Sequence, residues 1–193
     1  MIYPGGRSKL NFGRFFYIVC TVVILVAAAY GNQSGDRVSA KEQKNQRLIV
    51  QLTDSSGEQV GEAILTETAK GVRIALQAEK LKPGIHGIHF HENGICSPPD
   101  FMSAGEHFNP EHKKHGLKNP LGPHAGDMPN IFADSQGRVK TVIFNPMVTL
   151  EEGKANSLRD ADGSALIIHE SGDDQKTDPA GNSGKRVICG VIR

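Results

Sequence analysis

The stretch Gly87–Gly94, "GIHFHENG", places two histidines two residues apart with an aromatic residue between them. In a β-strand successive side chains alternate between the two faces, so His89 and His91 point to the same face. Ile88 and Phe90 point to the other face, where they can pack against a core. The stretch therefore predicts a strand whose second face can chelate a metal ion.

Short apolar or alternating runs recur on both sides of this stretch, with turn signals between them. The runs before it are RLIVQL, AILTET and VRIALQA, and those after it are NIFAD, RVKTVIF, SALIIHE and RVICGVI. Such short runs with frequent turn residues are typical of an all-β sandwich or barrel. No long helix is expected.

The interval 93–129 has almost no strand signal and is rich in proline and glycine. A long segment without regular structure inside a compact domain needs something that orders it, and a bound metal ion can do so. The interval offers three imidazoles and one carboxylate, from His107, His115, His124 and Asp127. This four-coordinate set suits the tetrahedral preference of zinc.

A second set of ligands contains only imidazoles. His169 ends the run SALIIHE, which is apolar enough to be a buried strand, so a rigid element can hold it near His89 and His91. Imidazole-rich sites with an open position favour copper, which has the highest affinity in the series of divalent ions.

The N-terminal segment is typical of an export signal. Phe15–Tyr30 is a run of 16 nearly unbroken apolar residues that ends in small residues and follows Arg7, Lys9 and Arg14. Its length lies between the ~7–15 residues of a signal-peptide core and the ~17–25 of a membrane span, so both cleavage and retention as an anchor stay open. In either case we expect the positively charged residues before the apolar run to stay in the cytoplasm and the rest of the chain to be extracytoplasmic.

These features divide the chain into three parts. Residues 1–30 are the signal peptide or membrane anchor, 31–46 form a polar, aromatic-free flexible tether, and 47–193 form the folded domain. The chain touches a membrane only through residues 15–30, and only if they are not removed. The formal net charge of +1 without any basic run argues against a nucleic-acid partner.

Cysteines outside the cytoplasm tend to oxidise. If Cys20 is an apolar filler of the N-terminal run, only Cys96 and Cys189 remain, and they allow one pairing. A bridge between them would close a long loop and stabilise the fold by about 4–5 kcal/mol in the chain-entropy model. Two unpaired buried thiols are the alternative.

Six blocks of the chain resemble the signature blocks of the copper/zinc superoxide dismutases, in the family's order across residues 47–193. The blocks are GIHGIHFHENG, SAGEHFNP, KHG, GPHAGDMPN, LIIHE and GNSGKRVICGVI. The resemblance implies an all-β fold, namely an eight-stranded Greek-key barrel or sandwich with two long metal-site loops. It also implies an exported enzyme that converts superoxide into dioxygen and hydrogen peroxide by alternating reduction and oxidation of copper.

The resemblance also implies a role for each residue of the site. Copper would be held by His89, His91, His107 and His169, and zinc by His107, His115, His124 and Asp127. His107 would thus bridge the two ions, and it would take up a proton so that peroxide can leave.

Four further residues match positions around the family's metal site. Arg186 matches the arginine that docks the superoxide anion, and Asp173 matches a carboxylate that orients a ligand of each metal. Cys96 and Cys189 match the family's intrasubunit disulfide.

A non-enzymatic function is the alternative, namely an extracellular module that buffers copper or zinc on the same scaffold without dismutase activity. Loss of a copper ligand would be expected of such a module, and this chain keeps all four positions. Members of the family are monomers or dimers, so a homodimer is one of the assemblies that the resemblance allows.

Overall fold

The computed structural model describes residues 46–193, and our predictions for residues 1–45 lie outside this part of the chain. The described residues form strands and one short 3-10 turn, η1. These elements are β1 (Arg47–Asp54), β2 (Gln59–Thr68), β3 (Gly71–Ala78), β4 (Gly84–His86), β5 (Ile88–His91), η1 (Met102–Ala104), β6 (Ile131–Ala133), β7 (Val139–Asn145), β8 (Ser164–His169) and β9 (Arg186–Ile192). Within residues 46–193 no helix is long and apolar enough to span a membrane.

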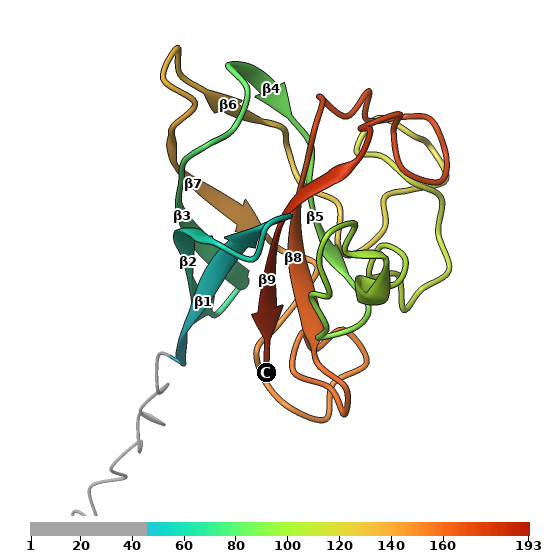
Figure 1. The fold of residues 1–193 in the computed structure, drawn as a ribbon. Coiled ribbons are helices and arrows are strands. Elements are labelled where there is room, and N and C mark those ends of the chain that lie inside the picture. The colour runs from blue at the N-terminus through green and yellow to red at the C-terminus, as the bar shows by residue number, and fades with distance from the viewer. Residues whose placement is uncertain (1–45) are drawn as a thin grey trace, which may run out of the picture. The chain divides into compact units, whose positions relative to one another are not determined.

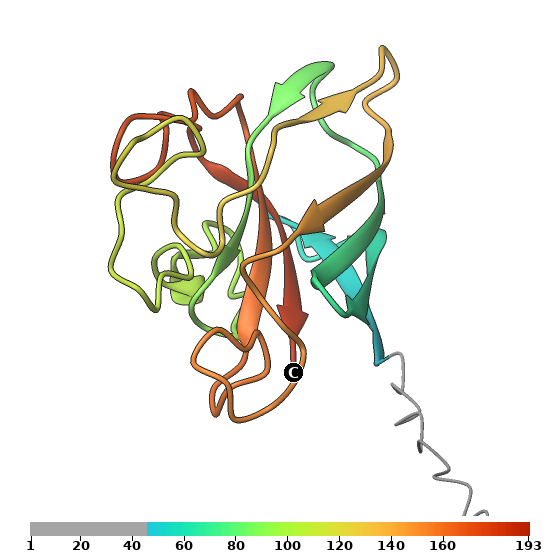
Figure 2. The ribbon, with the colours of Figure 1, turned by 180° about the vertical axis from the view of Figure 1, so that it is seen from behind.

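Seven strands form one antiparallel sheet in the order β5-β8-β9-β1-β2-β3-β7, while β4 and β6 pair separately. The large sheet curls into a half-barrel, and the β4–β6 pair lies at the end that is uppermost in Figures 1 and 2. The all-β, barrel-like fold expected from the sequence is confirmed.

The run that contains His89 and His91 forms two strands instead of one, because the chain changes its pairing partner at Gly87. Strand β4 pairs with β6, whereas β5 pairs with β8. The Gly87 N–H donates to the carbonyl of Ser171 over 2.8 Å, and its own carbonyl accepts from the His169 N–H over 2.9 Å. A Cβ at this position would lie 3.2 Å from the Cβ of Asp173 and 3.3 Å from Cε1 of His89. Glycine therefore lets the loop after β8 approach the start of β5.

Strands β5 and β8 are buried at every position, because they are covered on both faces. Their alternate residues Ile88, Phe90, Leu166 and Ile168 belong to the main core. The opposite face of β8 carries Ala165 and Ile167, which pack with Phe101, Ala104 and Cys189 in a second apolar cluster. The long segment 93–129 thus covers the outer face of these two strands, as Figure 1 shows.

Candidate metal centre

The histidines of the two buried strands lie on the face that the long segment covers. Alternation places His89 and His91 of β5 opposite to the core-facing Ile88 and Phe90, as the sequence predicts. On the neighbouring strand β8, His169 follows the same alternation as Ala165 and Ile167 of the second cluster. Two adjacent strands therefore present three imidazoles to one buried space.

The long segment returns along the free edge of β5 and adds its own candidate ligands there. Isolated antiparallel bridges join His91 to His107 and His89 to Asp127. Between these bridges the Phe90 N–H donates to the carbonyl of Gly126 over 2.9 Å. A Cβ on Gly126 would collide with the Phe90 carbonyl, so this glycine permits the close approach.

The first cluster consists of four imidazoles whose candidate ligand atoms all lie within 4.8 Å of one another. Its members are His89, His91, His107 and His169. Each ring has one buried nitrogen without a hydrogen-bond partner, namely Nδ1 of His89 and Nε2 of His91, His107 and His169. Buried polar atoms without partners are costly, and four of them converging on one point fit a metal ion that prefers nitrogen ligands.

The second nitrogen of each ring in this cluster is occupied. His89 Nε2 donates to Oδ2 of Asp173 over 2.7 Å. His91 Nδ1 donates to the Gly105 carbonyl over 3.0 Å, and His169 Nδ1 donates to the Gly184 carbonyl over 3.2 Å. His107 Nδ1 lies 3.0 Å from Oδ1 of Asp127. These contacts fix the ring orientation and leave the unpartnered nitrogen free to coordinate.

A second group of imidazoles surrounds the buried carboxylate of Asp127. Its Oδ1 lies 3.0 Å from Nδ1 of His107, 3.0 Å from Nδ1 of His115 and 3.5 Å from Nδ1 of His124. Its Oδ2 accepts the backbone N–H groups of Gly116 and His124, at 2.8 and 3.0 Å. The carboxylate is thereby fixed in place, and three nitrogens and one oxygen can meet in a tetrahedral set.

The tightest group around Asp127 contains His89 along with His107 and His115, and His124 lies slightly farther out. His89 is one of the two rings that Asp173 links, and its free Nδ1 faces the first cluster. The Nδ1 of His124 is also buried and unpartnered, which leaves it available to a metal ion.

Asp173 joins the two groups through its two carboxylate oxygens. Oδ2 accepts from His89, and Oδ1 accepts from Nε2 of His115 over 3.0 Å. The backbone of Asp173 is held in turn by the Asn130 side chain, which donates to its carbonyl and accepts its N–H. Sequence reasoning missed Asn130, as well as the carbonyls of Gly105 and Gly184, because none of these contacts leaves a pattern in the chain.

The ionisation of the first cluster suits metal binding at neutral pH, whereas His115 must lose a proton before it can coordinate. Burial lowers the pKa of His91 well below its usual value, and burial lowers the pKa of His107 to about 4 and that of His169 to about 3. Burial also opposes the charged form of His115, but its hydrogen bonds with Asp127 and Asp173 outweigh this effect and raise its pKa to about 9. The imidazoles of the first cluster are therefore neutral before any ion binds.

Arg186 opens strand β9 and lies at the edge of the first cluster. Its Nη1 donates to the Phe101 carbonyl over 2.8 Å and its Nη2 donates to the Gly105 carbonyl over 2.6 Å. The same Gly105 carbonyl accepts from His91. The long segment thus fixes a guanidinium beside the imidazoles.

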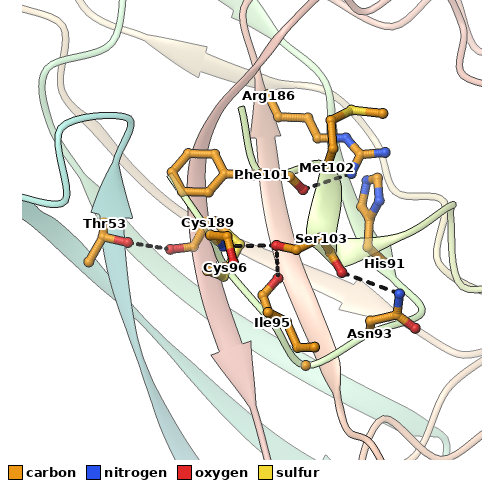
Figure 3. Close-up of a disulfide and its surroundings, with 12 residues drawn as sticks. Thr53, His91, Asn93, Ile95, Cys96, Phe101, Met102, Ser103, Arg186 and Cys189 are labelled. Atoms are coloured by element: carbon orange, nitrogen blue, oxygen red, sulfur yellow. Dashed lines mark hydrogen bonds between the residues drawn. A yellow bond between two sulfur atoms is a disulfide. The ribbon is translucent and has the colours of Figure 1, made fainter. Parts of the chain in front are cut away.

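Cys96 and Cys189 form a disulfide that ties the long segment to β9, with Cα atoms 5.8 Å apart. Figure 3 shows the bond between the β9 backbone and the loop that carries Phe101 and Ser103. The Ser103 hydroxyl accepts the Ser97 N–H over 2.8 Å and donates to a neighbouring loop carbonyl. The disulfide and these hydrogen bonds brace the loop that contains Phe101, whose carbonyl accepts a hydrogen bond from Arg186.

His86 is buried but lies outside both groups. Its two ring nitrogens are each 2.7 Å from a backbone carbonyl, those of His169 and Lys82. Neither nitrogen is free for a metal ion.

Comparisons with known proteins identify a family to which the chain is similar. The family model described as copper/zinc superoxide dismutase (SODC) matches residues 59–192. The superoxide dismutase (Cu-Zn) 2 of Aquifex aeolicus (strain VF5) is 52% identical over 157 residues, which cover 81% of this chain and 92% of that protein.

Two solved structures are also similar. The structure of a SOD-like protein from Bacillus subtilis has a TM-score of 0.73 and 43% sequence identity, covering 75% of this chain and 97% of the other. The structure of the Cu/Zn superoxide dismutase from Brucella abortus has a TM-score of 0.64 and 28% identity, covering 77% of this chain and all of the other.

Proposed function

The chain belongs to the copper/zinc superoxide dismutase family and is a superoxide dismutase with copper and zinc as cofactors, and from this premise we propose how its residues divide the work. The reaction converts two superoxide ions and two protons into dioxygen and hydrogen peroxide. The observation that carries the proposal is the set of buried, unpartnered imidazole nitrogens that converge within the two groups.

Copper would be held by the four unpartnered nitrogens of the first cluster, on His89, His91, His107 and His169. Zinc would be held by the atoms around the second group, on His107, His115, His124 and Asp127. His107 belongs to both sets, because its Nε2 faces the first cluster while its Nδ1 lies beside Asp127.

His124 is a better zinc ligand than His89 because of how the nitrogens of the two rings are used. The Nε2 of His89 donates to Asp173, so only its Nδ1 can coordinate, and that atom belongs to the copper set. The Nδ1 of His124 has no such competing role, and it lies 3.5 Å from the Asp127 oxygen.

Copper, when bound, supplies an alternation between two oxidation states, so that one superoxide is oxidised to dioxygen and the next is reduced to peroxide. His107 supplies a proton: its Nδ1 is held beside Asp127, and its Nε2 is the atom that can take up a proton and pass it to the departing peroxide. Asp173 keeps His89 and His115 in the orientation that coordination requires.

Arg186 would dock the superoxide anion. A guanidinium has five N–H donors in a planar fork, and only two of them are shown donating to the Phe101 and Gly105 carbonyls. The remaining donors and the fixed positive charge can bind a small anion with less loss of freedom than a lysine would allow.

We propose that the enzyme works outside the cytoplasm, exported by residues 1–30 and tethered through 15–30 if that segment is retained. A homodimer also stays a prediction.

The assignment of the zinc ligands can be tested by replacing His124 with alanine in the full chain and measuring both metals after loading. We expect zinc to be lost while copper is retained. His112→Ala, which changes an exposed histidine of the same segment, is the matched control and should keep both ions. Unchanged zinc content in the His124 variant would contradict the assignment.

A further inference from the structure

One methionine lies at the rim of the site with its side chain in solvent. Met102 begins the turn η1 and is 60% exposed. The other two methionines of residues 46–193 are less exposed, since Met128 is fully buried and Met147 is partly buried against the main core. Of the three thioethers in residues 46–193, that of Met102 is therefore the most accessible to an oxidant in solution.

The turn that carries Met102 is also the turn that holds Arg186. The carbonyls on either side of it, those of Phe101 and Gly105, accept the two hydrogen bonds of the guanidinium. In Figure 3 the side chain of Met102 extends on the same side of the turn as the Arg186 guanidinium and the His91 ring. The thioether thus projects from the same turn that fixes the guanidinium of Arg186.

We propose that Met102 is a modification site that the enzyme's own product oxidises to methionine sulfoxide. This inference rests on the proposed docking of superoxide at Arg186. The thioether sulfur attacks one oxygen of hydrogen peroxide, the O–O bond breaks, a sulfur–oxygen bond forms, and the second oxygen leaves as water after proton transfer. The sulfur is oxidised by two electrons and the peroxide is reduced by two, so the established reaction supplies the only oxidant needed.

The modification has a consequence for catalysis. Methionine is an apolar side chain, whereas the sulfoxide carries a polar oxygen that accepts hydrogen bonds. Arg186 has donors that the Phe101 and Gly105 carbonyls do not use. A sulfoxide at position 102 competes with superoxide for these donors, so accumulated peroxide slows the enzyme that makes it.

The experiment feeds superoxide continuously to the metal-loaded full chain and follows Met102 by peptide mass spectrometry. We expect the Met102 peptide to gain the mass of one oxygen atom at least about tenfold faster than the Met147 peptide, in line with its exposure. A parallel sample receives hydrogen peroxide directly, without superoxide. Activity should fall at least about twofold as the sulfoxide accumulates, and methionine sulfoxide reductase should restore both the mass and the activity.

Met102→Leu is the matched variant, because leucine has a similar volume and cannot form a sulfoxide. Before exposure to peroxide this variant should be as active as the wild type. During exposure it should show no loss of activity that methionine sulfoxide reductase can reverse. If superoxide turns over while Met102 is oxidised no faster than Met147, or if the leucine variant shows the same reversible loss, the inference is wrong. A loaded chain that does not turn over superoxide would contradict the proposed function instead, and the sample with added peroxide would still report the reactivity of Met102.

Discussion

At the scale of single residues, the site depends on histidines that are fixed at one nitrogen and free at the other. His91 and His169 are held by the backbone carbonyls of Gly105 and Gly184, and His89 is held by a carboxylate. The choice of partner decides which ring nitrogen carries the hydrogen, and so which one can coordinate. The contacts around the ligands are therefore as necessary as the ligands themselves.

Asp173→Asn should weaken the binding of both metals, because an amide cannot accept hydrogen bonds from His89 and His115 with two equivalent oxygens. We expect the affinity for copper and zinc, measured by competition with a chelator, to fall about 10–100-fold. Asp174→Asn is the control, because that exposed neighbour bonds only within its own loop. Equal affinities in the two variants would show that the carboxylate does not link the two groups.

The metal-free protein should lose stability as the pH falls from about 6.5 to about 4. In the unfolded chain His107 and His169 take up protons near pH 6.5, whereas burial lowers their folded-state pKa to about 4 and about 3. The unfolded state then binds more protons, and each such histidine lowers the free energy of unfolding by up to about 1.4 kcal/mol per pH unit.

His115 acts in the opposite direction at higher pH. Its pKa is raised to about 9 by hydrogen bonds that outweigh the effect of burial, so its contribution is present below pH 6.5 and is lost as the pH rises toward 9. Denaturant unfolding of the chelator-treated protein at several pH values measures both effects. A free energy of unfolding that does not change between pH 4 and 6.5 would contradict the burial of neutral imidazoles.

At the scale of elements, alternation within strands makes much of the fold and part of the site predictable. The alternate residues of β5 and the apolar run of β8 are enough to identify His89, His91 and His169 from the amino-acid sequence. The break at Gly87 does not follow from the sequence, because it depends on contacts with the loop after β8, which is distant along the chain.

The path of the segment 93–129 cannot be predicted from its own residues either. Its candidate ligands are recognised by residue type, whereas their positions depend on backbone bonds to the edge of β5 and on a second apolar cluster around Phe101. Such long-range pairing has no local periodicity from which it can be read.

Removal of the disulfide should affect both stability and substrate docking. Replacing Cys96 and Cys189 by serine removes the link between the long segment and β9, and we expect the free energy of unfolding to fall by about 2–5 kcal/mol. The carbonyls that hold Arg186 lie in the same segment, so kcat/KM should fall while copper and zinc remain bound. Wild-type kcat/KM in a fully metallated serine variant would contradict this role.

At the scale of the whole molecule, strands β5 and β8 of the half-barrel carry three of the candidate ligands, and the long segment brings the others to them. The assembly of this scaffold into a homodimer stays a prediction. Analytical ultracentrifugation of the full chain measures the assembly directly, and a homodimer should sediment at twice the mass of one chain. A wild-type chain that sediments as a monomer at high concentration would rule out this assembly.

The most direct test of the two-metal site is superoxide disproportionation by the full chain, with copper and zinc determined on the same sample. We predict one copper and one zinc per chain together with rapid turnover that slows as salt screens the attraction between superoxide and Arg186. Full occupancy by both metals without turnover would contradict the proposed roles of His107 and Arg186 and would favour a protein that only stores the ions.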